Sequence, residues 1–130
     1  MILQSDPSCY RPVDHDAFFE GWPVKPSYEL VMKHFEGSHP LFLLNENSEV
    51  VGFISALTDH ALYAFIALLE VRKSERGKGH GKYLVAEMLK SLNGTYAIDL
   101  VCDADLEAFY QPLGFAKHIA MIQRKRDALN

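Results

Sequence analysis

The spacing of apolar side chains predicts helices in the first third of the chain. Four prolines interrupt this region, at Pro7, Pro12, Pro23 and Pro26, and leave room for one short helix over residues 14–20. Ser27 is a typical N-cap for a second helix and Gly37 is a typical stop. Between them, apolar and aromatic positions recur on one helical face, at Leu30, Val31, His34 and Phe35. Two helices should therefore precede the first strand.

Three apolar stretches then follow, each with the length of a strand. They read PLFLLNEN, VVGFISAL and LYAFIALLEV, and the turn-like segments NENSE and TDHA join them. Short connections of this kind favour an antiparallel meander. The third stretch is apolar on both faces, so we expect it to lie in the centre of the sheet.

The second half predicts a crossover and a parallel strand pair. Apolar residues recur at helical spacing over 84–92, Asn93-Gly94 ends this helix, and TYAIDLVCD is typical of a buried strand. Asp103 or Asp105 should cap a further helix that Gly114 closes, and FAKHIAMIQRK should form a last strand. The expected fold is one mixed α/β domain over residues 1–130, in the order α-α-β-β-β-α-β-α-β.

Composition limits the possible environment and partners. The chain is 48% hydrophobic and 12% aromatic, which is typical of a folded globular protein. No apolar run reaches the length of a membrane span, and the N-terminus has no secretory pattern, so we expect a cytoplasmic protein that does not bind membranes. The two cysteines, Cys9 and Cys102, have no metal-ligand spacing. No metal is expected.

Charge is distributed unevenly along the chain. The net charge of −4 argues against a nucleic-acid partner. Residues 1–70 carry three cations against ten carboxylates, a net of −7, whereas residues 71–130 carry ten cations against seven carboxylates, a net of +3. The two halves therefore suit partners of opposite charge.

The stretch EVRKSERGKGHGKYL has the features of an anion site. Gly77, Gly79 and Gly81 leave backbone amides uncovered where a helix begins, and five cations surround them: Arg72, Lys73, Arg76, Lys78 and Lys82. The spacing fits neither a P-loop, because Tyr83 follows Gly81-Lys82, nor a G-x-G-x-x-G dinucleotide fingerprint. It fits Arg76-x-x-Gly79-x-Gly81.

This string, after a strand that ends in Leu-x-Val, resembles the coenzyme A-binding motif of the GNAT N-acetyltransferases. AFYQPLGF is similar to the Tyr-x-x-x-Gly-Phe segment of that family, and VVGFI matches its usual third strand. The resemblance implies an acetyl-CoA-dependent N-acetyltransferase whose cofactor-binding residues are Leu69, Val71, Arg76, Gly77, Lys78, Gly79, His80, Gly81, Lys82 and Asp103. It also implies that the pantetheine arm lies where two strands splay apart.

The resemblance assigns Tyr110 as the general acid that protonates the departing thiolate. Several relatives place a basic carboxylate on the central strand where this chain has Phe65, which cannot accept a proton. Glu70 is the nearby candidate base; an ordered water or an already neutral amine would serve equally.

The acceptor side involves few residues, and the sequence leaves alternatives for it. Aromatic residues near the N-terminus are its candidates, at Phe18, Phe19, Trp22 and Tyr28, and core packing is the other role open to them. Either an open cleft or a homodimer, in which a partner subunit completes the acceptor side, fits so short a chain. Two other functions stay open: a non-catalytic acyl-CoA-binding module, and a domain whose basic loop binds another phosphate.

Overall fold

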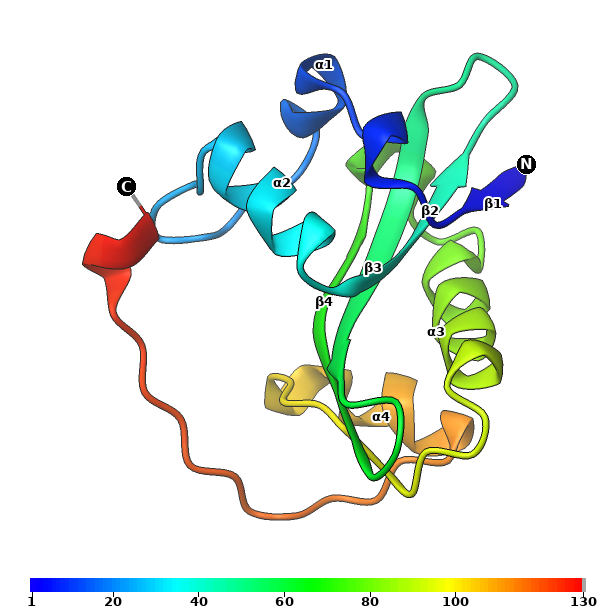
Figure 1. The fold of residues 1–130 in the computed structure, drawn as a ribbon, viewed down its shortest axis with the longest axis vertical. Helices are drawn as coiled ribbons and strands as arrows, with labels where there is room; N and C mark the ends of the chain where they lie inside the picture. Colours follow the sequence, from blue (N-terminus) through cyan, green and yellow to red (C-terminus); the bar gives the residue numbers. More distant parts are fainter. Residues whose placement is uncertain (130) are drawn as a thin grey trace.

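Five strands form one mixed sheet in the computed structural model, which describes residues 1–129 (Figure 1). The strands are β1 (Ile2–Gln4), β2 (His39–Leu44), β3 (Val50–Thr58), β4 (Tyr63–Val71) and β5 (Ala97–Asp99). They lie in the order β1-β2-β3-β4-β5. The first four pair antiparallel, and β4 pairs parallel with β5. The mixed α/β class and the antiparallel meander are confirmed.

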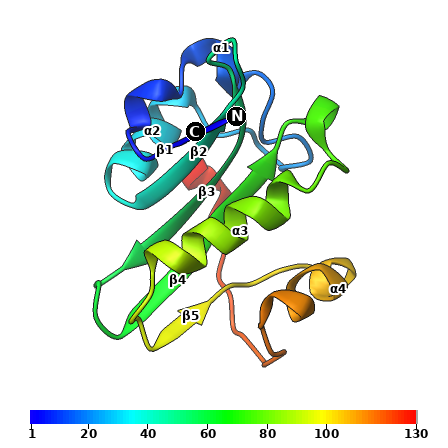
Figure 2. The same ribbon diagram turned by 90° about the vertical axis from the view of Figure 1, so that its right-hand side faces the viewer.

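Alternation along β2 divides the apolar core between the two faces of the sheet. Leu41 and Leu43 join a cluster with the helix α3 (His80–Ser91), and Tyr110 from α4 (Glu107–Tyr110) belongs to the same cluster. Phe42 and Leu44 point the other way, into an aromatic cluster beneath α1 (Pro12–His15) and α2 (Tyr28–Glu36). Figures 1 and 2 show α2 and α3 on opposite faces of the sheet.

The helix signals predicted for α2 act as expected, whereas the first helix is shorter than predicted. The Ser27 hydroxyl accepts a hydrogen bond from Leu30 N at 3.1 Å, and Gly37 is the C-cap of α2. The first helix spans only Pro12–His15 instead of 14–20. Phe19, with a φ of 66°, and Gly21, with a φ of 81°, are left-handed, so the chain turns away from a helical path there.

The expected last strand is wrong, and β1 is a strand that the sequence reading did not anticipate. Residues 116–125, called the C-terminal tail below, are extended but belong to no strand and lead to a short turn at Arg126–Leu129. Figure 1 shows the tail as a wide arc that leaves the body after α4. A strand-like pattern describes local conformation, whereas membership of a sheet requires an adjacent edge. Between residues 1 and 129, no helix is both long and apolar enough to cross a membrane.

Candidate active site

The glycine loop adopts a conformation that favours glycine at two positions. After β4 ends at Val71, a 3₁₀ turn at Lys73–Glu75 leads to α3. Gly77 and Gly79 have φ values of 77° and 85°, in the left-handed region that favours glycine. A Cβ built on either glycine would have no atom within 4 Å. The outer side of the loop is therefore open to a ligand.

The loop presents a row of amides without partners. Among residues 1–129, no acceptor receives a hydrogen bond from the amides of residues 77–82, and the first amide of α3 to find one is Tyr83 N, 3.0 Å from Gly79 O. Six consecutive donors at the positive end of a helix can hold a phosphate or pyrophosphate group.

Several of the cations expected to surround the glycines contact other protein groups instead. Arg72 does not serve the loop, because its Nη2 lies 3.3 Å from Asp14 Oδ1 and 2.9 Å from Val50 O, where it secures β3. Arg76 Nε donates to Val71 O at 3.0 Å and ties the loop to the end of β4. Lys78 Nζ pairs with Glu75 at 2.7 Å. His80 Nε2 is buried without a hydrogen-bond partner in the described chain.

The strands β4 and β5 separate next to the loop. Their parallel pairing covers only Tyr63–Phe65 against Ala97–Asp99, and past that point a cavity of about 540 Å³ opens between them. Arg72 N donates to Val51 O of β3 at 2.8 Å. Because successive amides of a strand point to opposite edges, the N–H groups of Val71 and Leu69 face the cavity. The splay that the sequence resemblance implied is present.

Glu70 lies in this cavity, and the surrounding protein changes its acidity. Its Oε1 accepts a hydrogen bond from Phe19 N at 2.8 Å. Burial raises the pKa of the Glu70 carboxyl above its usual range, against the opposing effects of the Phe19 N–H and of Arg76. Phe19 adopts its unusual positive φ where this hydrogen bond forms. A carboxylate with a raised pKa is a better proton acceptor than an ordinary one.

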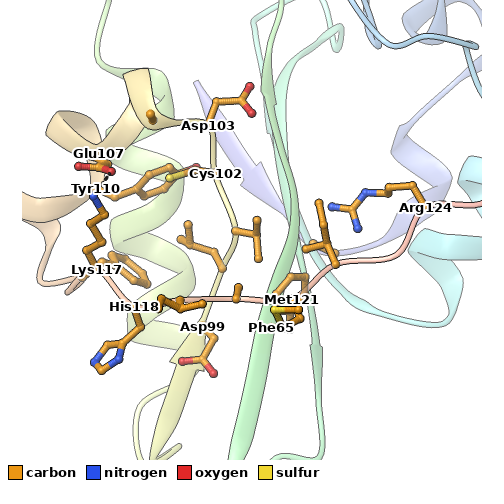
Figure 3. A pocket seen from close by; sticks show the side chains of 18 of the residues that line it. Phe65, Asp99, Cys102, Asp103, Glu107, Tyr110, Lys117, His118, Met121 and Arg124 are labelled. Carbon is orange, nitrogen blue, oxygen red and sulfur yellow. Dashed lines mark ion pairs between the residues drawn. The ribbon is translucent and has the colours of Figure 1, made fainter.

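Tyr110 reaches the same cavity from α4. Its side chain is nearly buried, at 9% exposure, between Phe109 and Phe115. Burial, and then the nearby Cys102, raise the pKa of the Tyr110 hydroxyl, which therefore keeps its proton at neutral pH. Figure 3 shows Tyr110 extending from α4 toward Cys102. A protonated phenol in this position can act as an acid.

The acceptor side differs most from the sequence reading. Phe18 and Phe19 are core residues, and Tyr28 packs against that core, so of the four aromatic candidates only Trp22 lines the cavity. The lining residues that were missed include Glu20, and Ile122 and Arg124 from the tail. Their sequence signal is weak, because each of these residues lies 50 or more positions from Glu70 along the chain, and nothing in its own sequence neighbourhood indicates a cavity.

The remaining expected site residues are only partly brought together. Asp103 lines the cavity. Its backbone carbonyl accepts the hydrogen bond from Leu106 N, at 2.9 Å, that begins the next turn, whereas its side chain makes no capping hydrogen bond. Gly81 faces inward, where a Cβ would lie 3.5 Å from Phe109. Within residues 1–129, no three His, Cys, Asp or Glu side chains are grouped as metal ligands.

Comparison with known proteins agrees with this geometry. Residues 9–115 match the acetyltransferase (GNAT) family. The crystal structure of a Deinococcus radiodurans protein assigned as an acetyltransferase is 34% identical, with a TM-score of 0.91 over 97% of this chain and 89% of that one. The chain belongs to the acetyltransferase (GNAT) family. GNAT proteins transfer an acyl group from acyl-CoA to an acceptor.

Other GNAT relatives are more distant or longer. A probable acetyltransferase of Glycine max is 30% identical over 74% of this chain and 44% of its own length. An uncharacterized N-acetyltransferase of Porphyra purpurea is 29% identical over 75% of this chain and 59% of its own length. The chain thus spans about half the length of these two relatives. Glucosamine-6-phosphate N-acetyltransferase from Arabidopsis thaliana shares the fold, with 18% identity and a TM-score of 0.71 over 95% of this chain and 97% of its own.

Proposed function

We propose that this GNAT domain is an acetyl-CoA-dependent N-acetyltransferase that passes the acetyl group directly to a primary amine while both substrates are bound. One observation carries the proposal. Glu70, with a raised pKa, and the protonated Tyr110 line one cavity of about 540 Å³. A base for the amine and an acid for the thiolate are the two proton-transfer groups that aminolysis of a thioester needs.

The loop and the splayed strands suit acetyl-CoA as substrate. The free amides of residues 77–82 would hold the pyrophosphate, and the open space beside Gly77 and Gly79 would admit it. The pantetheine arm would then run between β4 and β5, where the amides of Leu69 and Val71 face the cavity. This placement would bring the thioester to the cavity that Glu70 and Tyr110 line.

The side chains divide the chemistry between them. Glu70 takes a proton from the ammonium form of the acceptor and leaves a nucleophilic amine. The amine nitrogen forms a bond to the thioester carbonyl carbon, and the Val71 N–H stabilises the negative oxygen that develops. The C–S bond then breaks, and the Tyr110 hydroxyl gives its proton to the sulfur. The nitrogen of the new amide loses its second proton to solvent, and solvent also takes the proton from Glu70 and restores the one on Tyr110.

The acceptor is a primary amine that is cationic in water. Glu20 and Glu70 contribute carboxylates to the cavity and Trp22 contributes an aromatic surface, whereas Arg124 is the cation of the tail that lines it. Carboxylates and an aromatic face both attract an ammonium group. The net charge of −7 over residues 1–70 would add long-range attraction.

The test is release of coenzyme A thiol with a panel of polyamines, amino sugars, amino acids, and peptides with free lysine or N-terminal amines. The best acceptor should be cationic, and its kcat/KM should fall as salt is added. Glu20→Gln should raise the KM for that amine, whereas the control Glu46→Gln, in the β2–β3 turn, should not. Binding of acetyl-CoA without thiol release for any amine would refute the proposal and favour an acyl-CoA-binding module.

A further inference from the structure

One of the two cysteine thiols lies inside the candidate active site. Cys102 is partly buried and packs against the core cluster that contains Tyr110 (Figure 3). It lines the 540 Å³ cavity together with Glu70 and Tyr110. It also lines a neighbouring cavity of about 1820 Å³, so small molecules can reach it from either side. The proposed acetyl transfer gives this thiol no role.

The register of the parallel strands sets the position of Cys102 along the cavity. Phe65 pairs with Asp99, and three residues further along each strand Cys102 comes level with Leu68. The strands have separated there, so the cavity lies between these two residues. The next residue of β4 is Leu69, whose amide is a proposed contact of the pantetheine arm. The end of that arm, which carries the sulfur, would therefore lie close to Cys102.

A second observation at this place points to a bound group. The Tyr110 side chain is only 9% exposed, yet it lines both cavities. Burial and the nearby Cys102 raise the pKa of its hydroxyl, and no hydrogen bond within residues 1–129 is among the causes. Buried polar groups usually have a hydrogen-bond partner, so a buried hydroxyl that faces a cavity indicates that a ligand or water binds there. In the proposed reaction that partner is the coenzyme A sulfur.

We propose that Cys102 is a site of covalent modification, at which the thiol of coenzyme A forms a mixed disulfide with the protein under oxidising conditions. This inference rests on the coenzyme A binding of the proposed function, and not on transfer to an amine. Acetyl-CoA has no free thiol, so the modification requires the deacetylated form in the site. The adduct would occupy the acetyl-CoA site and block turnover until a reducing agent removes it.

A peroxide supplies the oxidising equivalents. The Cys102 sulfur attacks one oxygen of hydrogen peroxide, the O–O bond breaks, and a sulfenic acid on Cys102 and one water form. The sulfur of bound coenzyme A then attacks the Cys102 sulfur. The S–S bond forms, the S–O bond breaks, and the coenzyme A thiol proton leaves with the hydroxyl as a second water. Two thiols are oxidised to one disulfide, and one peroxide is reduced to two waters.

The glycine loop should make this modification selective for coenzyme A. The amides of residues 77–82 would hold its pyrophosphate, which keeps the thiol in the cavity at a high effective concentration. Glutathione has no phosphate for this loop to bind.

Cys9 is the control that the chain itself provides. It is not among the residues that line either cavity. Burial, and then Asp6 and Asp14, raise the pKa of the Cys9 thiol to about 11, so it stays protonated and unreactive at neutral pH. Oxidation in the presence of coenzyme A should therefore spare Cys9.

Intact-protein mass spectrometry of the full chain, treated with hydrogen peroxide and coenzyme A, tests the proposal. The wild type and Cys9→Ser should each gain one coenzyme A, Cys102→Ser should gain none, and dithiothreitol should reverse the gain. Glutathione at the same concentration should react on the order of ten-fold more slowly. Gly79→Ala, which strains the left-handed loop, should slow the reaction with coenzyme A but not that with glutathione.

Equal rates with glutathione and coenzyme A would overturn the proposal, as would an adduct on Cys102→Ser. So would a wild type that binds coenzyme A in calorimetry and stays unmodified. If Cys102→Ser does not fold, peptide mapping of the wild-type adduct assigns the disulfide to Cys102 or to Cys9. Thiol release with an amine but no adduct would refute this inference alone, whereas an adduct without transfer to any amine would refute only the proposed function.

Discussion

The cofactor side and the acceptor side of the cavity are built in different ways. The cofactor side is one continuous loop, residues 76–82, in which the backbone provides the donors and glycines keep them open. The acceptor side takes Glu20 and Trp22 from one segment, Glu70 from β4, and Ile122 and Arg124 from the tail. A site made of backbone amides is encoded by one short motif. A site made of distant side chains is encoded only by the whole fold.

The two sides also differ in what holds them. The loop leads into α3, whose Leu84, Val85 and Met88 are fully buried against the sheet. The tail has no comparable anchor within one chain, because no hydrogen-bond ladder joins it to the sheet among residues 1–129. We therefore expect acetyl-CoA binding to tolerate changes in the tail, and acceptor use to be sensitive to them.

The largest effect is expected at Tyr110, where the two sides meet. Tyr110→Phe keeps the ring among Phe109 and Phe115 but removes the proton, so kcat should fall roughly 100-fold. Because the hydroxyl would act on the departing sulfur, the Kd for acetyl-CoA should change little. Steady-state kinetics and calorimetry measure the two quantities. Wild-type turnover by the variant would show that another group protonates the thiolate.

A change on the cofactor side should instead weaken the binding of acetyl-CoA. Gly79→Ala forces a side chain into a left-handed conformation at a cost of about 1–3 kcal/mol, enough to weaken acetyl-CoA binding by about ten-fold or more if the loop shifts. Gly81→Ala is the matched control, because its Cβ would make only ordinary contact with Phe109. Equal affinities of the two variants would show that the backbone conformation at Gly79 does not matter for binding.

The same contrast explains how much could be predicted from the sequence. The meander, the crossover helix and the glycine loop follow from local patterns, and Gly77 and Gly79 adopt the left-handed conformation that their residue type permits. The last strand was wrong because residues 116–125 have a strand pattern without an edge beside them in one chain. Glu20 and Arg124 were missed because only tertiary structure brings them to Glu70.

On the acceptor side, Glu70→Gln should lower kcat/KM on the order of ten-fold near neutral pH, because the ammonium loses its proton acceptor. The effect should shrink as pH rises, since a neutral amine from solution needs no base. The pH profile of kcat/KM measures both. A constant ratio of wild type to variant across the pH range would show that Glu70 does not accept the proton.

Glu70→Gln should also stabilise the fold slightly. Because the folded-state pKa of Glu70 is raised, the native state binds more protons than the unfolded state between the ordinary and the raised value. Stability of the wild type is therefore lost as pH rises through that window. The variant should melt at a higher temperature than the wild type at pH 8, and the difference should vanish well below the ordinary glutamate pKa. A lower melting temperature at pH 8 would indicate that charged Glu70 is stabilised by its surroundings.

The initial-velocity pattern with acetyl-CoA and the best amine tests the central claim, that the two substrates occupy the two sides of one cavity at the same time and the acetyl group passes directly between them. Direct transfer between bound substrates predicts double-reciprocal lines that intersect as either concentration is varied. Parallel lines would contradict the account, because they indicate that the acetyl group first moves to the protein. Cys102, which lines the cavity beside Tyr110, would then be the group to examine.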